Sequence, residues 1–270
     1  MKYKIICCDL DDTLLDNDGN ISEEIKKSVA RFVDAGGKFT IVTGRMTAGA
    51  RPVAAELDLH GELITYQGSV VTDIDTGVVL DSISIPWEQA AEIGRYLESR
   101  SVYYQTYEGD EFITEKANIY TVYYGRISHA EFRETKIKLS DYITETRLSP
   151  PKLLIMEPEE VVPALEEELK EKFGHMFRIN TSKPFLIEII PKEMNKAVAV
   201  ERLGKKYNVK KEEIICIGDS ENDLPMIQYA GLGVAVANAT DLVKRYADVI
   251  APSNQENGVA WTIDNYGFLK

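Results

Sequence analysis

Residues 5–20 read IICCDLDDTLLDNDGN, an apolar run that breaks into a cluster of aspartates. The cluster consists of Asp9, Asp11, Asp12, Asp16 and Asp18. Like charges this close repel one another, so the arrangement requires a cation, backbone donors or open water to take up the negative potential. A polar turn between a buried strand and a helix explains Asp16 and Asp18. It does not explain Asp9 and Asp11, which stand at the tip of the strand.

The spacing of the cluster excludes an EF-hand calcium loop. If Gly19 takes the sixth position of such a loop, Leu14 falls at the first position and Ile25 at the twelfth. Both positions require oxygen ligands, which leucine and isoleucine cannot supply.

The composition is that of a globular protein with an acidic excess. The chain has 270 residues, 44% of them hydrophobic and 28% charged, and a formal net charge of -13. This length allows one large domain, or a domain with a smaller insert. The charge argues against a nucleic-acid partner, because such a surface needs clustered Lys and Arg. A small anion held by local positive groups remains open.

The sequence predicts a cytoplasmic protein without a membrane partner. The N-terminal segment MKYKIICCDLDD has too short an apolar run for a signal peptide, and no stretch approaches the roughly 20 apolar residues of a membrane span. Cys7, Cys8 and Cys216 lie in apolar runs without C-x-x-C spacing, so we expect reduced core residues. The sequence leaves the oligomeric state open.

Strand-like and helix-like stretches alternate at both ends of the chain. Residues 4–67 read as strand, helix, strand, helix and strand, which predicts parallel strands with right-handed crossovers. Residues 68–83 are expected to form a hairpin around the turn DTG. The alternation returns after Pro191, beginning with a helix at 195–207.

The middle of the chain is richer in strands. Its apolar runs are SISIP, VYYQTY, EFIT, IYTVYY, KLLIME, FRINT and FLIEII. Helices are expected at 87–100, 129–142 and 158–173. We therefore predict an α/β domain of residues 1–84 and 191–270, interrupted by an α+β domain of residues 85–190.

Polar side chains stand where strands of the α/β domain end, which is where ligands bind in such sheets. They are Asp9 and Asp11, then Thr43, Gly44 and Arg45, then Asp219, Ser220, Asn222 and Asp223, together with Lys196 at the start of a helix. Singly, each has an ordinary interpretation: Thr43, Asp219 or Ser220 could cap a helix, and Lys196 could be a surface lysine. Jointly they predict a metal and phosphate site.

The residue types suit phosphoryl transfer. The carboxylates of Asp9 and Asp219 suit a hard cation such as Mg²⁺. A carboxylate can attack phosphorus, and a second one two residues on can protonate the leaving oxygen and then deprotonate water. Ammonium, hydroxyl, amide and backbone N–H groups can stabilise the charge on the transferring phosphoryl group.

Four motifs carry a family resemblance. They are DLDDT (9–13), VTGR (42–45), NKAVAV (195–200) and GDSENDLPM (218–226), with an insert between the second and the third. This set resembles the haloacid dehalogenase (HAD) superfamily of phosphatases, and most of all its Cof-like subgroup with a type IIB cap. The resemblance implies a Rossmann-like parallel-sheet core with an inserted α+β cap, which we expect to close over the strand ends and to select the substrate.

The resemblance also implies roles for individual residues. Asp9 would be the nucleophile and Asp11 the acid/base. Mg²⁺ would be held by Asp9, the Asp11 carbonyl and Asp219, with Asp223 in support. Phosphate would be held by Thr43, Gly44, Lys196, Asn222 and the Leu10 amide.

Two positions depart from the family pattern. The family often has Asn-Gly where this chain has Gln67-Gly68, and Lys-Gly where it has Lys196-Ala197. Three residues are candidates for contact with the substrate: Arg45, Gln67 and Asn254. Asn254 lies in NQENGVAW (254–261), which could equally be a turn that caps the last helix.

The expected function is Mg²⁺-dependent hydrolysis of a small phosphorylated metabolite, a sugar phosphate by resemblance, through an aspartyl-phosphate. A phosphomutase and a non-catalytic regulator that binds a phosphorylated metabolite are the alternatives. Serine or cysteine hydrolase chemistry needs a histidine base, and His60, His129 and His175 lie away from every motif.

Overall fold

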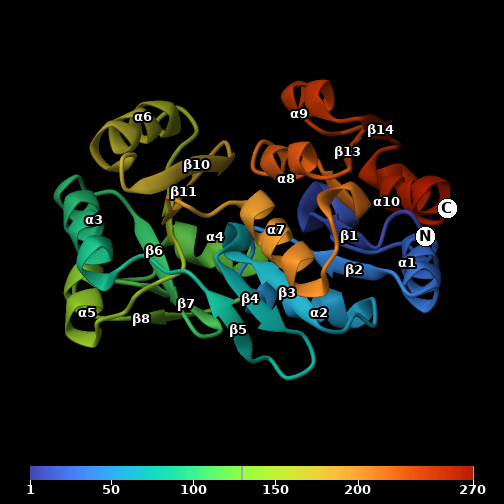
Figure 1. The fold of residues 1–270 in the computed structure, drawn as a ribbon. Helices are drawn as coiled ribbons and strands as arrows, with labels where there is room; N and C mark the ends of the chain where they lie inside the picture. The colour runs from blue at the N-terminus through green and yellow to red at the C-terminus, as the bar shows by residue number, and fades with distance from the viewer. Residues whose placement is uncertain (129, 270) are drawn as a thin grey trace. The chain divides into compact units, whose positions relative to one another are not determined.

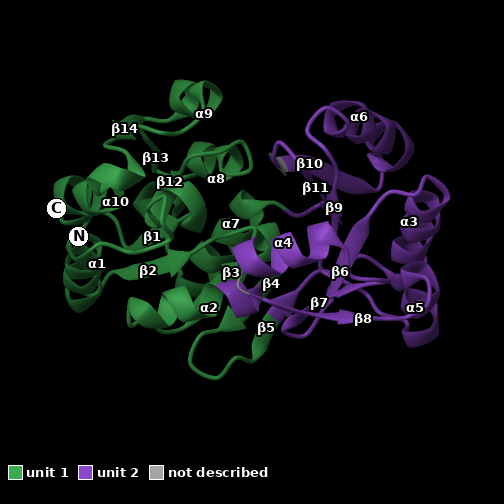
Figure 2. Ribbon diagram, turned by 180° about the vertical axis from the view of Figure 1, so that it is seen from behind, with its two compact units in different colours: residues 1–44, 50–80, 195–270 green, residues 45–49, 81–194 purple. Residues whose placement is uncertain are grey.

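The computed structural model describes residues 1–128 and 130–269 (Figure 1). His129, the first residue of a helix expected at 129–142, lies outside the described residues. The chain forms two compact units (Figure 2). The first comprises Met1–Gly44, Ala50–Leu80 and Asn195–Lys270, and the second comprises Arg45–Gly49 and Asp81–Met194.

A five-stranded parallel sheet forms the centre of the first unit. Its order is β14 (Val249–Ala251), β13 (Leu232–Val236), β12 (Ile214–Gly218), β1 (Ile5–Cys8) and β2 (Lys38–Ile41). Every neighbouring pair is parallel, which confirms the predicted α/β fold class. Strand β1 therefore lies between β2, the next strand in sequence, and β12, which follows the insert.

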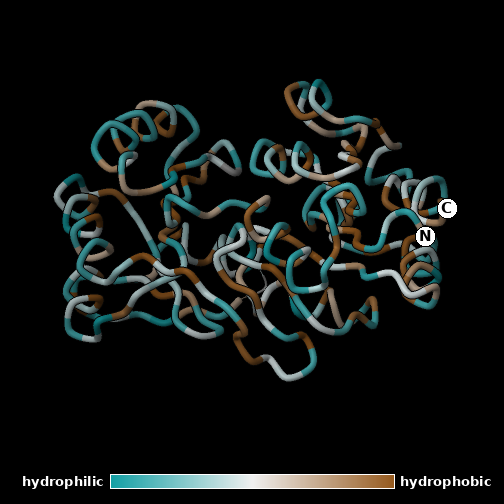
Figure 3. The backbone as a smooth tube through the Cα atoms, viewed as in Figure 1, coloured by the Kyte–Doolittle hydropathy of each residue, from teal (hydrophilic) through white to brown (hydrophobic). Residues whose placement is uncertain are grey.

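Helices cover both faces of this sheet, so β1, β12 and β13 are buried along their whole length. Ile6 and Cys8 of β1 belong to the core cluster that includes α1 (Glu23–Asp34), while Ile5 and Cys7 belong to the cluster that includes α7 (Lys196–Tyr207). The alternation follows from the two-residue repeat of a strand. In Figure 3 the colours of hydrophobic residues predominate along β1.

The remaining helices of the parallel-sheet region are short. They are α2 (Thr47–Glu56), α8 (Leu224–Tyr229), α9 (Asp241–Tyr246) and α10 (Gly258–Thr262). Helix α10 lies beside α1 (Figures 1 and 2). The three cysteines are buried free thiols, as the sequence predicted.

The third apolar run of the chain does not extend the parallel sheet. Strand β3 (Glu62–Thr65) instead begins a separate sheet of order β3, β4 (Val70–Asp73) and β5 (Val79–Ser82). A single parallel bridge, Val42 with Ile64, connects it to the end of β2. The expected hairpin is present as β4 and β5, and the run SISIP forms no strand beyond Ser82.

The second unit contains a six-stranded sheet. Its order is β10 (Phe177–Lys183), β11 (Leu186–Pro191), β9 (Leu153–Met156), β6 (Tyr104–Glu108), β7 (Glu111–Thr114) and β8 (Glu131–Glu134). Helices α3 (Trp87–Ser99), α5 (Leu139–Thr146) and α6 (Val162–Phe173) share one hydrophobic core with it. This architecture is the strand-rich α+β pattern expected for the middle of the chain.

Two local predictions in this unit were wrong. The run IYTVYY forms helix α4 (Ile119–Ser128), although its β-branched and aromatic residues favour strands. Asn118 explains the difference, because its Oδ1 accepts the Thr121 N–H at 3.1 Å while its own N–H donates to Thr121 Oγ1 at 3.0 Å. The second wrong prediction is the single helix expected at 129–142. This range instead includes β8 and the beginning of α5, with Lys136 between them at a φ of 62°.

No helix among the described residues is long and apolar enough to cross a membrane.

Glu62 of β3 ties the small sheet to its neighbours. Its side chain is 3% exposed and is paired with Lys38 of β2 at 2.8 Å and with Lys206 of α7. Tyr207 donates its hydroxyl hydrogen to the same carboxylate at 2.7 Å. Burial alone would raise the pKa of Glu62, but the contacts with Lys206, Lys38 and Tyr207 outweigh it and lower the pKa to about 2.

We predict that Glu62→Gln lowers the free energy of unfolding at pH 7 by about 2 kcal/mol. Because the folded pKa lies below the ordinary value of 4.5, the stabilisation is complete above that pH and is lost as the pH falls towards about 2. The free energies of unfolding of the parent and of Glu62→Gln are measured by urea unfolding at pH 7 and pH 3. Both proteins carry Trp87→Phe, so that the fluorescence of Trp261 alone reports unfolding.

Glu56→Gln is the matched control, since Glu56 forms an exposed pair with Lys26. We expect its effect to stay below about 0.5 kcal/mol. An equal loss for Glu62→Gln at both pH values would contradict the electrostatic explanation.

Candidate active site

The adjacent ends of β1 and β12 bring the two aspartate motifs together. Asp9 follows β1, and its N–H donates to the Ile217 carbonyl of β12 at 2.9 Å. One carboxylate oxygen from each of Asp9, Asp219 and Asp223 lies within 4.8 Å of the others. Asp9 is 5% exposed and Asp223 is fully buried, so this negative charge is concentrated away from bulk water.

Lys196 supplies the countercharge. It is the first residue of α7, which Asn195 caps by accepting the Val198 N–H at 3.0 Å. Its Nζ lies 2.5 Å from Asp9 Oδ1 and 2.5 Å from Asp223 Oδ1. The side chain is 0% exposed, so Lys196 is not the surface lysine of the ordinary interpretation.

Asp223 also shapes the loop after β12. Its Oδ2 accepts the N–H groups of Asp219 and Ser220, both at 3.1 Å. One carboxylate oxygen thus contacts Lys196 while the other holds the backbone beside Asp219. Asp223 therefore fixes the position of two other charged residues in the cluster.

Thr13 is a site residue that sequence reasoning did not select. It is the last residue of the DLDDT motif, and its Oγ1 donates to Asp219 Oδ1 at 2.9 Å. The motif spacing contained this signal, because Thr13 lies in a tight turn, Leu10–Leu14, that directly follows Asp9. In that turn Asp11 is half-buried, and Asp12 adopts a φ of 57°.

The electrostatics of the cluster favour a bound cation. Burial, followed by the charge of Asp223, raises the pKa of Asp9 well above its ordinary value. The same two causes raise the pKa of Asp219 to about 7. Burial lowers the pKa of Lys196, but Asp223 and Asp9 outweigh this and raise it overall. Two buried carboxylates and the half-buried Asp219, with one ammonium, leave excess negative charge. An all-oxygen donor set fits Mg²⁺.

Residues predicted to hold phosphate gather around the same strand ends. Thr43 is 1% exposed and follows β2, where its N–H donates to the Ile64 carbonyl at 3.0 Å. Asn222 lies in the loop after β12, and its Nδ2 donates to Gln67 Oε1 at 3.1 Å. Gly44 lies against the Gln67 side chain. Leu10, whose amide was also selected, begins the turn after Asp9.

Two candidate substrate residues have structural partners of their own. Arg45 is grouped with the second unit and donates from Nη1 to the Gly49 carbonyl at 3.3 Å. Asn254 is 4% exposed, and its Nδ2 donates to the Leu15 carbonyl at 3.0 Å. Contact of either residue with a substrate stays a prediction.

The polar turn expected after the first aspartates is also present. Asp16 Oδ1 accepts the N–H groups of Asp18 at 2.9 Å and Asn20 at 2.8 Å. These bonds lower the pKa of Asp16, the largest contribution coming from Asn20. Asp16 and Asp18 thus shape the chain and do not join the carboxylate cluster.

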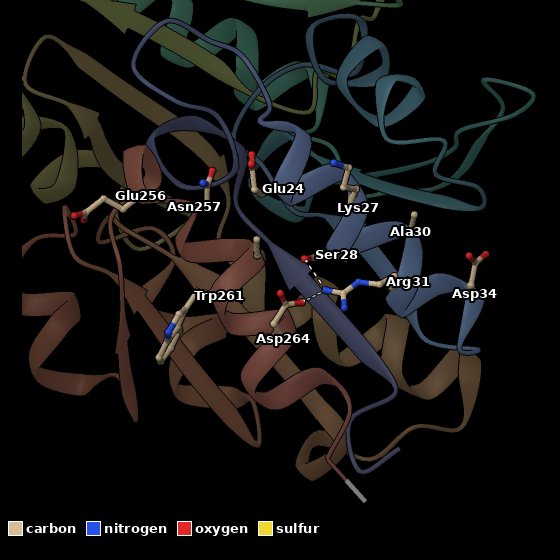
Figure 4. A pocket seen from close by; sticks show the side chains of 11 residues that line it. Glu24, Lys27, Ser28, Ala30, Arg31, Asp34, Glu256, Asn257, Trp261 and Asp264 are labelled. Carbon is tan, nitrogen blue, oxygen red and sulfur yellow. Dashed lines mark hydrogen bonds and ion pairs between the residues drawn. The ribbon is translucent and has the colours of Figure 1, made fainter.

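A separate pocket opens between α1 and α10 (Figure 4). Arg31 bonds to Ser28 at 3.2 Å and pairs with Asp264 there. The other labelled side chains, including Trp261, come from the same two elements and the turn before α10. None of the candidate catalytic residues lines this pocket.

Comparison with known proteins agrees with the geometry of the site. The sequence pattern of the family described as haloacid dehalogenase-like hydrolase matches residues 6–263. Two Bacillus subtilis proteins named 5-amino-6-(5-phospho-D-ribitylamino)uracil phosphatase are each 30% identical. For YwtE the match covers 97% of both chains, and for YitU it covers 98% of both.

A solved structure supports the same relationship. The crystal structure of a haloacid dehalogenase-like hydrolase from Bacteroides thetaiotaomicron is 30% identical and has a TM-score of 0.87. The match covers 97% of this chain and 98% of that one. Both the parallel-sheet unit and the inserted unit are therefore included in the similarity.

We predict that Lys196→Met lowers the free energy of unfolding at pH 7 by about 3 kcal/mol, because Asp9 and Asp223 lose their buried partner. The same fluorescence-detected urea unfolding measures the change. Lys205→Met on α7 is the control: Lys205 is 74% exposed beside Glu201, and we expect a loss below about 0.5 kcal/mol. Equal losses for the two variants would mean that the buried pair contributes no more than a surface pair.

Proposed function

The chain belongs to the haloacid dehalogenase-like hydrolases and is a phosphatase, and from that premise we propose that it hydrolyses a small phosphorylated metabolite in the cytoplasm through Asp9, with Mg²⁺ as cofactor. The observation that carries the proposal is the buried contact of Lys196 with Asp9 and Asp223, next to Asp219. This constellation can accept a phosphate dianion, because cations balance the carboxylates.

Asp9 is proposed as the nucleophile. Its carboxylate oxygen forms a bond to phosphorus as the bond to the leaving oxygen breaks, and Asp11 gives its proton to that oxygen. In the second step Asp11 takes a proton from water, whose oxygen attacks phosphorus and releases the Asp9 carboxylate. Support comes from the position of both residues directly after β1 and from the buried ammonium beside Asp9.

Mg²⁺ would be held by Asp9, Asp219 and the backbone carbonyl of Asp11. When bound, it would supply positive charge to the phosphoryl oxygens. Asp223 is proposed as a supporting residue, because its two oxygens already contact Lys196 and the backbone of Asp219 and Ser220.

The phosphoryl oxygens would be bound by groups from separate loops. Thr43 would supply a hydroxyl, Leu10 and Gly44 would supply N–H groups, and Asn222 would supply an amide. Lys196 would contribute positive charge from its buried position beside Asp9. With Lys196→Ala we expect weaker phosphate binding and slower turnover.

We propose that the second unit is a cap that selects the substrate. The sequence predicted this unit as residues 85–190. Its sheet and helices have a hydrophobic core of their own, which suits movement as one body. We propose a sugar phosphate or a related phosphate ester as the substrate class. The two relatives named for a phosphorylated ribitylamino compound support this class. Arg45 and Asn254 remain proposed substrate contacts.

We predict that the protein releases phosphate from p-nitrophenyl phosphate with Mg²⁺ and not after chelation. Asp9→Asn should retain the fold and lose at least about a thousandfold in kcat, because no nucleophile remains. Asp18→Asn, at an exposed aspartate of the same loop, is the control and should keep parental kinetics. A labelled phosphoryl group trapped on any other residue would refute Asp9 as the nucleophile.

Two other results would support the alternative functions, a phosphomutase or a non-catalytic regulator. Phosphate transfer to a second hydroxyl of a sugar phosphate, without release, would identify a phosphomutase. Binding of phosphorylated metabolites without turnover would identify a regulator.

Asp11→Asn should lower kcat by about a hundredfold to ten-thousandfold, because protonation of the leaving group and activation of water are both lost. Metal affinity should change little, since only the Asp11 carbonyl is proposed to touch Mg²⁺. Titration with Mn²⁺, followed by paramagnetic resonance, measures the affinity. A matching loss of metal affinity would instead make the Asp11 carboxylate a ligand.

A further inference from the structure

The turn after β3 has an unusual backbone. Tyr66, Gln67 and Gly68 all lie in the left-handed region, with φ values of 51°, 59° and 98°. Tyrosine and glutamine rarely adopt this conformation, because their Cβ atoms crowd the backbone. It persists only where surrounding contacts fix the chain.

Backbone contacts fix this turn at two places. The Gln67 N–H donates to the Thr43 carbonyl at 3.0 Å. A Cβ at Gly68 would lie 2.8 Å from the Asn195 oxygen and 3.0 Å from Ala199 Cβ, so the turn packs directly on the first turn of α7. The turn thus joins the end of β2 to the helix that begins at Lys196.

The Gln67 side chain reaches a third element. It is 3% exposed, and its Oε1 accepts Asn222 Nδ2 at 3.1 Å. The other end of the Asn222 amide accepts the Ser220 hydroxyl at 2.7 Å, so both ends of this amide are engaged. A Cβ at Gly44 would lie 2.4 Å from Gln67 Nε2, which means that the Gln67 amide passes directly over Gly44.

We propose that Gln67 is a positioning residue that holds Asn222 and the Thr43–Gly44 segment in the arrangement that binds the phosphoryl group. In this role it acts through Asn222, to which its buried Oε1 is bonded, and not as a substrate contact. The inference rests on the proposed function, since it assigns a role within that phosphate site.

The left-handed backbone is what this role requires. The Gln67 N–H bonds to Thr43 on one segment while its side chain bonds to Asn222 on another. The close approach of Gly68 to α7 places the same turn beside the helix of Lys196. Three phosphate-binding segments therefore share one rigid turn.

A double-mutant cycle between Gln67 and Asn222 tests the proposal. Gln67→Met keeps the side-chain length and removes the acceptor. With p-nitrophenyl phosphate, we expect Gln67→Met to raise KM, and the inhibition constant of inorganic phosphate, about tenfold while kcat falls less. The double variant with Asn222→Ala should match Asn222→Ala alone. Effects that multiply, or a fall in kcat at unchanged KM, would overturn the proposal.

The side-chain amide resonance of Asn222 provides a readout that needs no turnover. It should shift in Gln67→Met and return towards its parental position in Gln67→Glu, which keeps both length and acceptor. An unchanged resonance in Gln67→Met would overturn the contact. If Gln67→Met does not fold, Gln67→Glu carries the test, and loss of the parental resonance there would count against the proposal.

These readouts separate the two levels of inference. A parent protein that releases no phosphate from any ester contradicts the proposed function, while the Asn222 resonance still reports on the contact. A parent that releases phosphate, with independent effects at Gln67 and Asn222, contradicts the positioning role alone.

Discussion

The buried contact of Lys196 with Asp9 and Asp223 is the interaction on which the first unit depends. Three carboxylates within 4.8 Å of one another cannot remain ionised in a buried site without a nearby cation. The ammonium comes from α7 and the carboxylates from the ends of β1 and β12, so the contact joins segments on either side of the insert. It offsets part of the negative charge that the carboxylates concentrate at the strand ends.

The sequence was sufficient to predict the parallel sheet and to select charged residues that the structure brings together at its edge. Apolar runs buried on both faces identify β1, β2 and β12, and motifs at strand ends identify Asp9, Asp219 and Lys196. It was insufficient where local preference and tertiary contacts disagree. The run IYTVYY has strand-forming residues, yet the Asn118 cap begins a helix. Gln67 was selected only as a substrate contact, because residue type does not reveal its left-handed backbone.

Buried charged residues in each unit lie beside partners of opposite charge. In the first unit Glu62 contacts Lys38 and Lys206, and in the second the Nζ of Lys152 lies 2.5 Å from Glu188 Oε1. Both carboxylates are at most 5% exposed. Such pairs make substitution of one partner costly, so they favour a single packing arrangement around each sheet.

The position of β1 between β2 and β12 has a consequence for synthesis on the ribosome. One edge of β1 lacks its partner, β12, until residues Ile214–Gly218 have emerged from the ribosome. By then the whole of the inserted unit has already emerged. Apart from the short segment Arg45–Gly49, the inserted unit is one continuous stretch, Asp81–Met194. It can therefore collapse first, while the nascent β1 edge remains open to non-native pairing. The Asp9 carboxylate gains its ammonium partner only after the insert has been synthesised, so a chain that stops before Lys196 cannot assemble the cluster.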